Sequence, residues 1–205
     1  MTATSPAPGA VLQAHGLGFR HPGTDVLAGL SFSIGPGLAW VRGGDGRGKS
    51  TLLRLMAGTL APTAGELRRG TASVWFEDAA DAAANATVAQ AWLEARRALH
   101  AGWDRALERR LVDAFGLAEH IAKPLYMLST GSRRKVGLVG AAASGARLTL
   151  VDAPFAALDA PSIRALTALF EQAAADAQRT WVVADHELPA ALAGVPLAGW
   201  VDLGD

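Results

Sequence analysis

The segment from Gly43 to Thr51 constrains the fold of this chain more than any other. It reads Gly-Gly-Asp-Gly-Arg-Gly-Lys-Ser-Thr and fits the pattern G-x-x-x-x-G-K-[ST], in which backbone amides and a lysine surround phosphate groups. An apolar run at 38–41 precedes it, and a segment of helical pattern at 50–57 follows it. A strand, a glycine-rich loop and a helix in this order predict a phosphate-binding loop in an α/β protein.

The phosphate loop also predicts the type of ligand. Its glycines allow the positive φ angles that turn backbone N–H groups inward, and Lys49 adds a mobile cation. The Ser50 hydroxyl is placed to bind Mg²⁺. A nucleoside triphosphate is therefore expected, held by the whole motif: Gly43, Gly44, Asp45, Gly46, Arg47, Gly48, Lys49, Ser50 and Thr51.

Two apolar runs in the second half of the chain have the pattern of strands buried on both faces of a parallel sheet. They span 148–151 and 181–184, and each is followed by an acidic residue. The segment between them, 161–177, has helical periodicity, which predicts a strand–helix–strand crossover. Ligands of open α/β sheets lie at the carboxyl ends of strands, so we expect the phosphate loop, Asp152 and His186 to meet there.

The first part of the chain has the pattern of short strands. Clustered apolar residues with glycine and proline breaks predict strands at 11–19 and 29–34. After the phosphate-loop helix, a short hairpin is expected over 66–69 and 72–76, with Gly70 in its turn. These segments predict a small antiparallel part beside the core.

Further along, the apolar period becomes helical. A helix is expected from about Thr87, with Asn85 or Thr87 as its N-cap, and a second helix at 104–115. This Ala-, Leu- and Arg-rich region, about 87–135, is interpreted as an inserted helical subdomain. The fold class predicted is therefore α/β: a P-loop NTPase (RecA-like) core with a small N-terminal antiparallel β part and this insert.

Composition excludes several classes of function. Lys plus Arg and Asp plus Glu both number 19, so the formal net charge is zero and nucleic acid is not an expected partner. The chain has no cysteine, which excludes disulfides and cysteine-bound metal. No apolar run reaches the ~18 residues that would span a bilayer, so direct membrane insertion is not expected.

The order of motifs along the chain resembles that of the nucleotide-binding subunit of ATP-binding cassette (ABC) proteins. After the phosphate loop, 128–132 reads Leu-Ser-Thr-Gly-Ser and is similar to the LSGGQ signature. The run 148–152 resembles the Walker B strand, 157–159 (Ala-Leu-Asp) the D-loop, and His186 the switch histidine. The resemblance covers nearly the whole chain after residue 10.

The resemblance implies a domain plan, cofactors and site residues. Residues 1–10 are expected to be a disordered N-terminus and 11–205 an ABC ATP-binding domain, with ATP and Mg²⁺ as cofactors. Ser50 and Asp152 would hold the metal, and His186 would be the catalytic residue. Beyond the phosphate loop, the nucleotide would contact His21, Glu77, Ser129, Gly131, Asp152 and Asp159.

The resemblance also implies partners and a location. In this family the signature of one subunit reads the γ-phosphate bound by the other. A dimer with itself or with a homologous ABC subunit is therefore expected, working with a separate transmembrane permease subunit. Such a subunit is cytoplasmic and peripheral on the inner face of the cell membrane. In size, the chain resembles compact subunits such as that of the haem exporter of cytochrome c maturation.

Several positions depart from the family pattern. Ala153 occupies the place of the glutamate that orients or deprotonates the attacking water, and losing a general base typically costs about 10²- to 10⁴-fold in rate. Slow hydrolysis with intact ATP binding is therefore expected, whether the alanine is natural to a degenerate subunit or introduced. Further departures are His21 at the adenine-stacking position, Glu77 at the position of the loop glutamine, and Thr130 and Ser132 in the signature.

Different functions explain different parts of this pattern. The motif order favours the ATP-binding subunit of a transporter, whereas Ala153 favours an alternative, a non-hydrolysing ATP-dependent dimerisation or regulatory module. A P-loop kinase would explain 43–51 but not 128–131 or His186. The tryptophans near the insert are Trp75, Trp92 and Trp103. Two interpretations are open for them: core packing, which is favoured, and contact with a membrane partner.

Overall fold

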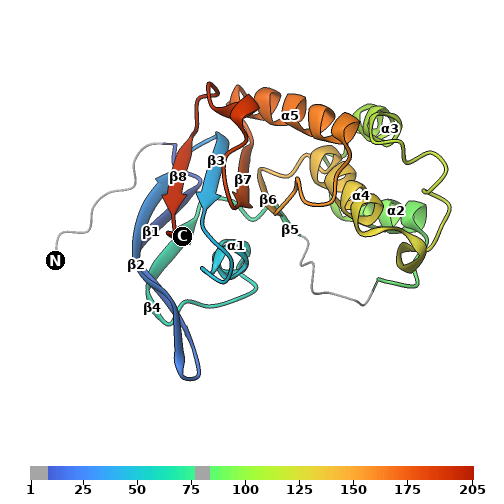
Figure 1. Ribbon diagram of the computed structural model, residues 1–205. Helices are drawn as coiled ribbons and strands as arrows, with labels where there is room; N and C mark the ends of the chain where they lie inside the picture. The colour runs from blue at the N-terminus through green and yellow to red at the C-terminus, as the bar shows by residue number, and fades with distance from the viewer. Residues whose placement is uncertain (1–8, 77–83) are drawn as a thin grey trace.

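A parallel sheet lies at the centre of the molecule, with helices on one face and a second, antiparallel sheet on the other (Figure 1). The computed structural model describes residues 9–76 and 84–205. The parallel sheet confirms the expected α/β core, and its strands lie in this order: β5 (Val74–Phe76), β6 (Leu148–Asp152), β7 (Thr180–Asp185), β3 (Gly37–Arg42) and β8 (Gly199–Asp202).

The central strands are buried on both faces because their side chains alternate between two cores. In β3, Leu38 and Trp40 pack among the helices, while Ala39 and Val41 face α1 (Lys49–Ala57) and the antiparallel sheet. Each of these side chains has an exposed fraction of 0%. The uninterrupted apolar runs of the sequence therefore reflect burial on both faces, as predicted.

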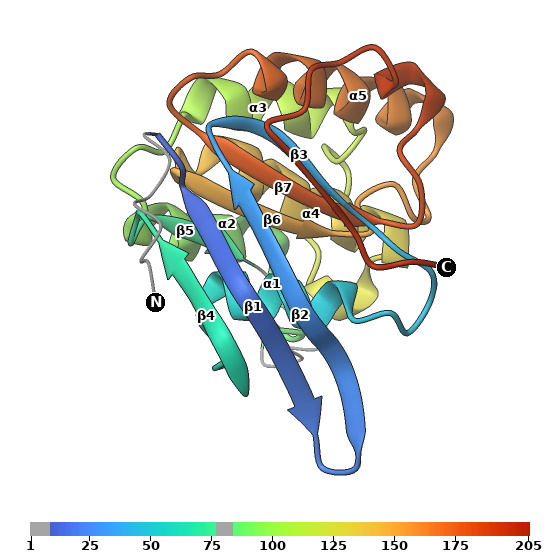
Figure 2. The same cartoon turned by 90° about the vertical axis from the view of Figure 1, so that its left-hand side faces the viewer.

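The antiparallel sheet confirms the strands expected at 11–19 and 29–34. The predicted hairpin of 66–69 with 72–76 is wrong, because the first of these segments pairs with the N-terminal strand and the second pairs with β6 in the parallel sheet. The strands lie in this order (Figure 2): β2 (Thr24–Ile34), β1 (Leu12–His21) and β4 (Ala64–Arg69).

Hydrogen bonds at the end of β4 explain why β4 does not form a hairpin with β5. The Arg69 guanidinium donates to the carbonyls of Met56 and Ala57 at the end of α1. The Gly70 N–H donates to the Val11 carbonyl at 2.9 Å and so extends the pairing with the N-terminal strand. Both partners are remote in sequence, so the chain passes from one sheet to the other where a local pattern suggested a turn.

Helices cover the face of the parallel sheet opposite α1 (Figure 1). The limits predicted for the helical insert, about 87–135, stay a prediction, and the last of its helices continues to Ala143. The predicted disordered N-terminus, 1–10, lies outside the described residues except for Gly9 and Ala10. Within 9–76 and 84–205, no helix is long and apolar enough to cross a membrane. The helices are α2 (Ala89–Leu99), α3 (Arg105–Ala114), α4 (Thr130–Ala143), α5 (Ala160–Ala174), η1 (Leu125–Met127) and η2 (Ala190–Leu192).

The N-terminus of α2 differs from the expectation. Neither Asn85 nor Thr87 is its N-cap; that position belongs to Val88, which makes no side-chain capping bond. The Ala89 N–H donates instead to the Lys123 carbonyl at 3.0 Å. A backbone segment from beyond α3 therefore satisfies an amide that a capping side chain would otherwise satisfy.

Candidate functional site

The phosphate loop lies between the carboxyl end of β3 and the start of α1. Gly46 and Gly48 have φ angles of 75° and 89°, in the left-handed region that favours glycine. A Cβ atom on Gly48 would lie 2.8 Å from Cγ1 of Val26 and 2.9 Å from Cδ2 of Leu27. The start of β2 therefore presses on the loop, and only glycine fits at this position.

Lys49 places its charge on the loop itself. Its Nζ atom donates to the Gly43 carbonyl at 2.6 Å and to the Gly44 carbonyl at 2.8 Å. The side chain is half-buried. The cation is thus held over the segment whose glycines were expected to surround phosphate.

The two predicted metal ligands are hydrogen-bonded to each other. The Ser50 hydroxyl at the start of α1 donates to Oδ2 of Asp152 at the end of β6. A hydroxyl and a carboxylate oxygen are ligands that Mg²⁺ accepts when phosphate oxygens and water complete its shell. The residues present therefore fit a phosphate-bound Mg²⁺, with Ser50 and Asp152 as the protein ligands.

The end of β7 brings a second carboxylate to the same place. Burial raises the pKa of Asp185, and the neighbouring charge of Asp152 raises it further, while the His186 amide and the Lys49 cation lower it. The His186 N–H donates to Oδ1 of Asp185 at 2.8 Å, and the His186 ring is exposed. The sequence pattern that places Asp152 at the end of β6, an acidic residue after an apolar run, occurs again at Asp185 at the end of β7.

The position after Asp152 has an unusual backbone. Ala153 has a φ angle of 43°, and its N–H donates to the Ala184 carbonyl at 2.7 Å. A residue other than glycine is uncommon in this region of φ. The turn that leaves β6 is thus tied directly to β7.

The signature segment forms the start of α4. Ser129 is its N-cap residue, and its hydroxyl accepts the Ser132 N–H at 3.0 Å. Gly131 lies in the first turn of this helix, where a Cβ atom would be 2.2 Å from the Ala157 carbonyl oxygen. The signature and the D-loop therefore pack backbone against backbone.

Asp159 is engaged by structural partners. It is the N-cap residue of α5, and its Oδ1 accepts the Ser162 N–H at 2.9 Å. Its Oδ2 accepts from the Lys135 ammonium at 2.5 Å, and this bond, with those to Ser162, holds the pKa of the carboxyl well below its usual range. Lys135 is buried and also donates to the Phe115 carbonyl at 3.1 Å. The carboxylate thus links α4 to the start of α5.

The remaining predicted site residues have varied surroundings, and one lies outside the described residues. His21 is at the exposed end of β1, with its ring edge-on to Phe19 at a centroid distance of 4.9 Å. Asp45 is exposed, and Arg47 donates from its guanidinium to the Asp205 carbonyl. Thr51 is half-buried in the first turn of α1, and Glu77 lies outside the described residues.

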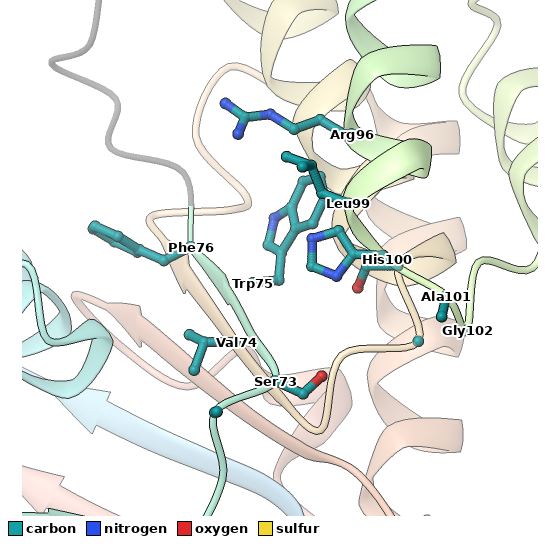
Figure 3. Close-up of a pocket in the computed structure, with 12 residues that line it drawn as sticks. Ser73, Val74, Trp75, Phe76, Arg96, Leu99, His100, Ala101 and Gly102 are labelled. Carbon is teal, nitrogen blue, oxygen red and sulfur yellow. The ribbon is translucent and has the colours of Figure 1, made fainter.

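A separate pocket of about 630 Å³ opens beside β5, an edge strand of the parallel sheet. In Figure 3, the Trp75 indole lies against the His100 ring with Leu99 next to them. The centroids of the two rings are 5.3 Å apart. Trp75 and Trp92 are 4% and 5% exposed, which confirms core packing for these two, whereas Leu99 is 72% exposed.

Comparisons with known proteins give a consistent family. The family model described as ABC transporter matches residues 27–156. The chain is 38% identical, over 70% of its length and 73% of the relative's, to the cytochrome c biogenesis ATP-binding export protein CcmA of Sphingopyxis alaskensis. It is 33% identical to the taurine import ATP-binding protein TauB of Chromobacterium violaceum, over 89% of this chain and 75% of that protein.

Solved structures support the fold. An ABC transporter ATP-binding protein from Pyrococcus furiosus superposes with a TM-score of 0.75 at 19% identity, covering 94% of this chain and 96% of that one. The ATP-binding subunit of another ABC transporter gives a TM-score of 0.74 at 20% identity, over 87% and 80% of the two chains. At such identities the likeness concerns architecture, and it agrees with the P-loop NTPase core predicted from the sequence.

Proposed function

Since the chain belongs to the ABC transporter family of ATP-binding proteins, we propose that it binds Mg-ATP between two such subunits and thereby drives a separate membrane subunit. The observation that carries this proposal is the hydrogen bond from Ser50 to Asp152, which joins the phosphate loop to the end of β6. These side chains supply the oxygen ligands for a phosphate-bound Mg²⁺. The Lys49 ammonium, held on the loop, supplies the positive charge for the phosphates.

The start of α4 supports the dimer in this proposal. Ser129 and Thr130 are exposed, and they lie at the N-terminus of a helix, where the dipole favours an anion. In the family, this segment meets the γ-phosphate bound by the opposite subunit. We therefore propose that the nucleotide completes its contacts only when a second copy or a homologue closes over it.

The test of the proposed function is ATP binding coupled to association. Equilibrium binding of Mg-ATP and the apparent mass of the protein would be measured with and without nucleotide. Binding is expected, with a shift from monomer to dimer in Mg-ATP, and Ser129→Arg should abolish the shift while leaving ATP binding to the single chain. A chain that does not bind ATP, or whose mass does not change, would contradict the proposal.

The pocket beside β5 is the surface we propose for the membrane subunit. It combines an exposed apolar side chain, Leu99, with the guanidinium of Arg96, which lies 5.0 Å from the Trp92 ring centroid. The imidazole of His100 adds an uncharged wall, because burial and the Arg96 charge lower its pKa. A short segment with one apolar side chain and one carboxylate complements this surface. On this proposal the subunit is cytoplasmic and peripheral on the inner face of the membrane.

Co-purification tests this surface. The chain would be co-expressed with the permease subunit encoded beside its gene, and the complex isolated through the permease. Leu99→Glu should release the chain, whereas Ile163→Glu, which changes another exposed apolar side chain of a helix, should not. Equal recovery of the two variants would contradict the proposed docking surface, though not the ATP site.

The second candidate function is a non-hydrolysing, ATP-dependent dimerisation or regulatory module. Ala153 favours it, because the residue after Asp152 carries no carboxylate. Turnover by the purified chain separates the two candidates. A rate near that of an ordinary ABC subunit would exclude the regulatory module, and a permease complex that never forms would exclude the transporter subunit.

A further inference from the structure

The ends of β6 and β7 lie side by side in the parallel sheet. Asp152 is in register with Ala184, and the Ala153 N–H donates to the Ala184 carbonyl at 2.7 Å. The next residue along β7 is Asp185. The strand pairing therefore sets a carboxylate beside the position where the family glutamate is replaced by alanine.

Asp185 is partly buried at the end of β7. Its carboxylate accepts the His186 N–H at 2.8 Å. The charged groups that act on it are Lys49 of the phosphate loop and Asp152. The side chain is thus fixed at the end of β7, next to the end of β6 and within the electrostatic influence of the phosphate-loop lysine.

We propose that Asp185 takes over the role of the carboxylate missing at Ala153 and holds the water that attacks the γ-phosphate of ATP. In this step the water oxygen forms a bond to the γ-phosphorus, and the bond from that phosphorus to the β,γ-bridging oxygen breaks. The bridging oxygen leaves on ADP with the electron pair, and the water proton passes to the Asp185 carboxylate. The inference rests on the proposed function, since it requires ATP to bind at the phosphate loop.

The other acidic residues near this part of the described chain have different positions. Asp152 accepts from the Ser50 hydroxyl, and Asp159 is bonded to Lys135 and the start of α5. Glu187 is exposed, beyond His186. Asp185 is therefore the carboxylate that combines partial burial, a fixed orientation and the Lys49 charge.

The experiment compares Asp185→Asn with Glu187→Gln in the full chain. Single-turnover release of phosphate, ATP affinity and the lifetime of the ATP-bound dimer would be measured, with the thermal unfolding midpoint as a check on folding. Asp185→Asn keeps the shape of the side chain but removes its charge, so turnover should fall by about 10²-fold. ATP affinity should stay within about threefold, and the ATP-bound dimer should persist correspondingly longer, while Glu187→Gln should behave as the parent.

Several outcomes would overturn the inference. They are a parent chain with no turnover above the uncatalysed rate, an Asp185→Asn variant that turns over as the parent does, and a Glu187→Gln variant that loses as much. If Asp185→Asn unfolds, Asp185→Glu, which keeps the charge, supports the inference by retaining turnover and overturns it by losing turnover while remaining folded. Failure of ATP binding in the parent would contradict the proposed function itself, so the two failures are distinguishable.

Discussion

The two halves of the candidate site differ in how far they keep the family pattern. In the phosphate-holding half, Gly43 to Thr51 with Asp152, the lysine is bonded to two loop carbonyls and the serine is bonded to the aspartate. The water-activating half, where β6 and β7 end, has alanine at 153 and an aspartate at 185. ATP binding and ATP hydrolysis can therefore change separately, because they depend on different elements.

The difference also shows how a parallel sheet permits a functional group to move. Neighbouring strands end at the same edge, so a carboxylate on β7 lies close to one lost from β6. The chemistry needs an oxygen acceptor at a point in space and not at a given place in the sequence. Substitutions in each half can therefore test its role separately.

The largest effect is expected for Ala153→Glu. A carboxylate at the family position should raise ATP turnover by up to about 10²-fold, because a general base contributes about 10²- to 10⁴-fold and Asp185 already supplies about 10²-fold of this in the parent. The positive φ angle at position 153 adds no new strain for glutamate, since alanine already occupies that conformation. In this background, Asp185→Asn should lower turnover much less than in the parent. Unchanged turnover in Ala153→Glu would show that the water-activating half is impaired at other residues as well.

The phosphate-holding half is tested by Lys49→Met. The variant keeps a long side chain but loses a charge that reaches the phosphates, a type of contact worth about 1.5–3 kcal/mol, so ATP affinity should fall by about 10- to 100-fold. Lys123→Met, at an exposed loop lysine, is the matched control and should bind ATP as the parent does. Equilibrium titration with Mg-ATP measures both, and equal affinities would contradict the role of the loop.

Local patterns sufficed for the elements that carry the phosphate-holding half. The runs at 38–41, 148–151 and 181–184 are continuous because both faces of each strand are buried, and this leaves a visible trace in the sequence. The end of α1 was predictable because glycine, here Gly58, commonly follows the last residue of a helix. Gly58 has the left-handed conformation typical of that position, with a φ angle of 80°. In each case the cause lies within the segment itself.

The other features depend on strand pairing or have too weak a pattern, so local patterns do not predict them. β4 and β5 are close in sequence, but their partners, β1 and β6, decide which sheet each one joins. The position of Asp185 follows from the register between β6 and β7, which no single segment contains. β8 is short, and Gly199 and Asp202 enclose just two apolar residues, so its pattern is too weak to predict a strand.

A smaller effect is expected where the signature meets the D-loop. Lys135→Met fills the buried space but leaves the Phe115 carbonyl and Asp159 without their donor. Loss of a buried partner costs about 1–3 kcal/mol, so the free energy of unfolding should fall by about this amount. Urea denaturation would measure it, with Lys123→Met expected to match the parent. A loss confined to ATP-dependent dimerisation, without loss of stability, would instead assign Lys135 to the interface.

The smallest effect is the dependence of stability on acid through Asp159. The bonds to Lys135 and Ser162 lower its pKa in the folded state, so its contribution is present above the unfolded pKa of about 4 and is lost as pH falls through the folded pKa. Asp159→Asn should therefore lose stability at neutral pH and lose less than the parent on acidification to about pH 3. Denaturation midpoints at the two pH values would measure this, with Asp113→Asn on α3 as the control. The effect should be modest because the Asp159 side chain is 55% exposed, and screening by water weakens such ion pairs. Identical acid profiles for Asp159→Asn and the parent would mean that the D-loop aspartate does not stabilise the fold. Asp159 would then be available to the nucleotide or to the opposite subunit, and it would belong with the phosphate-holding half.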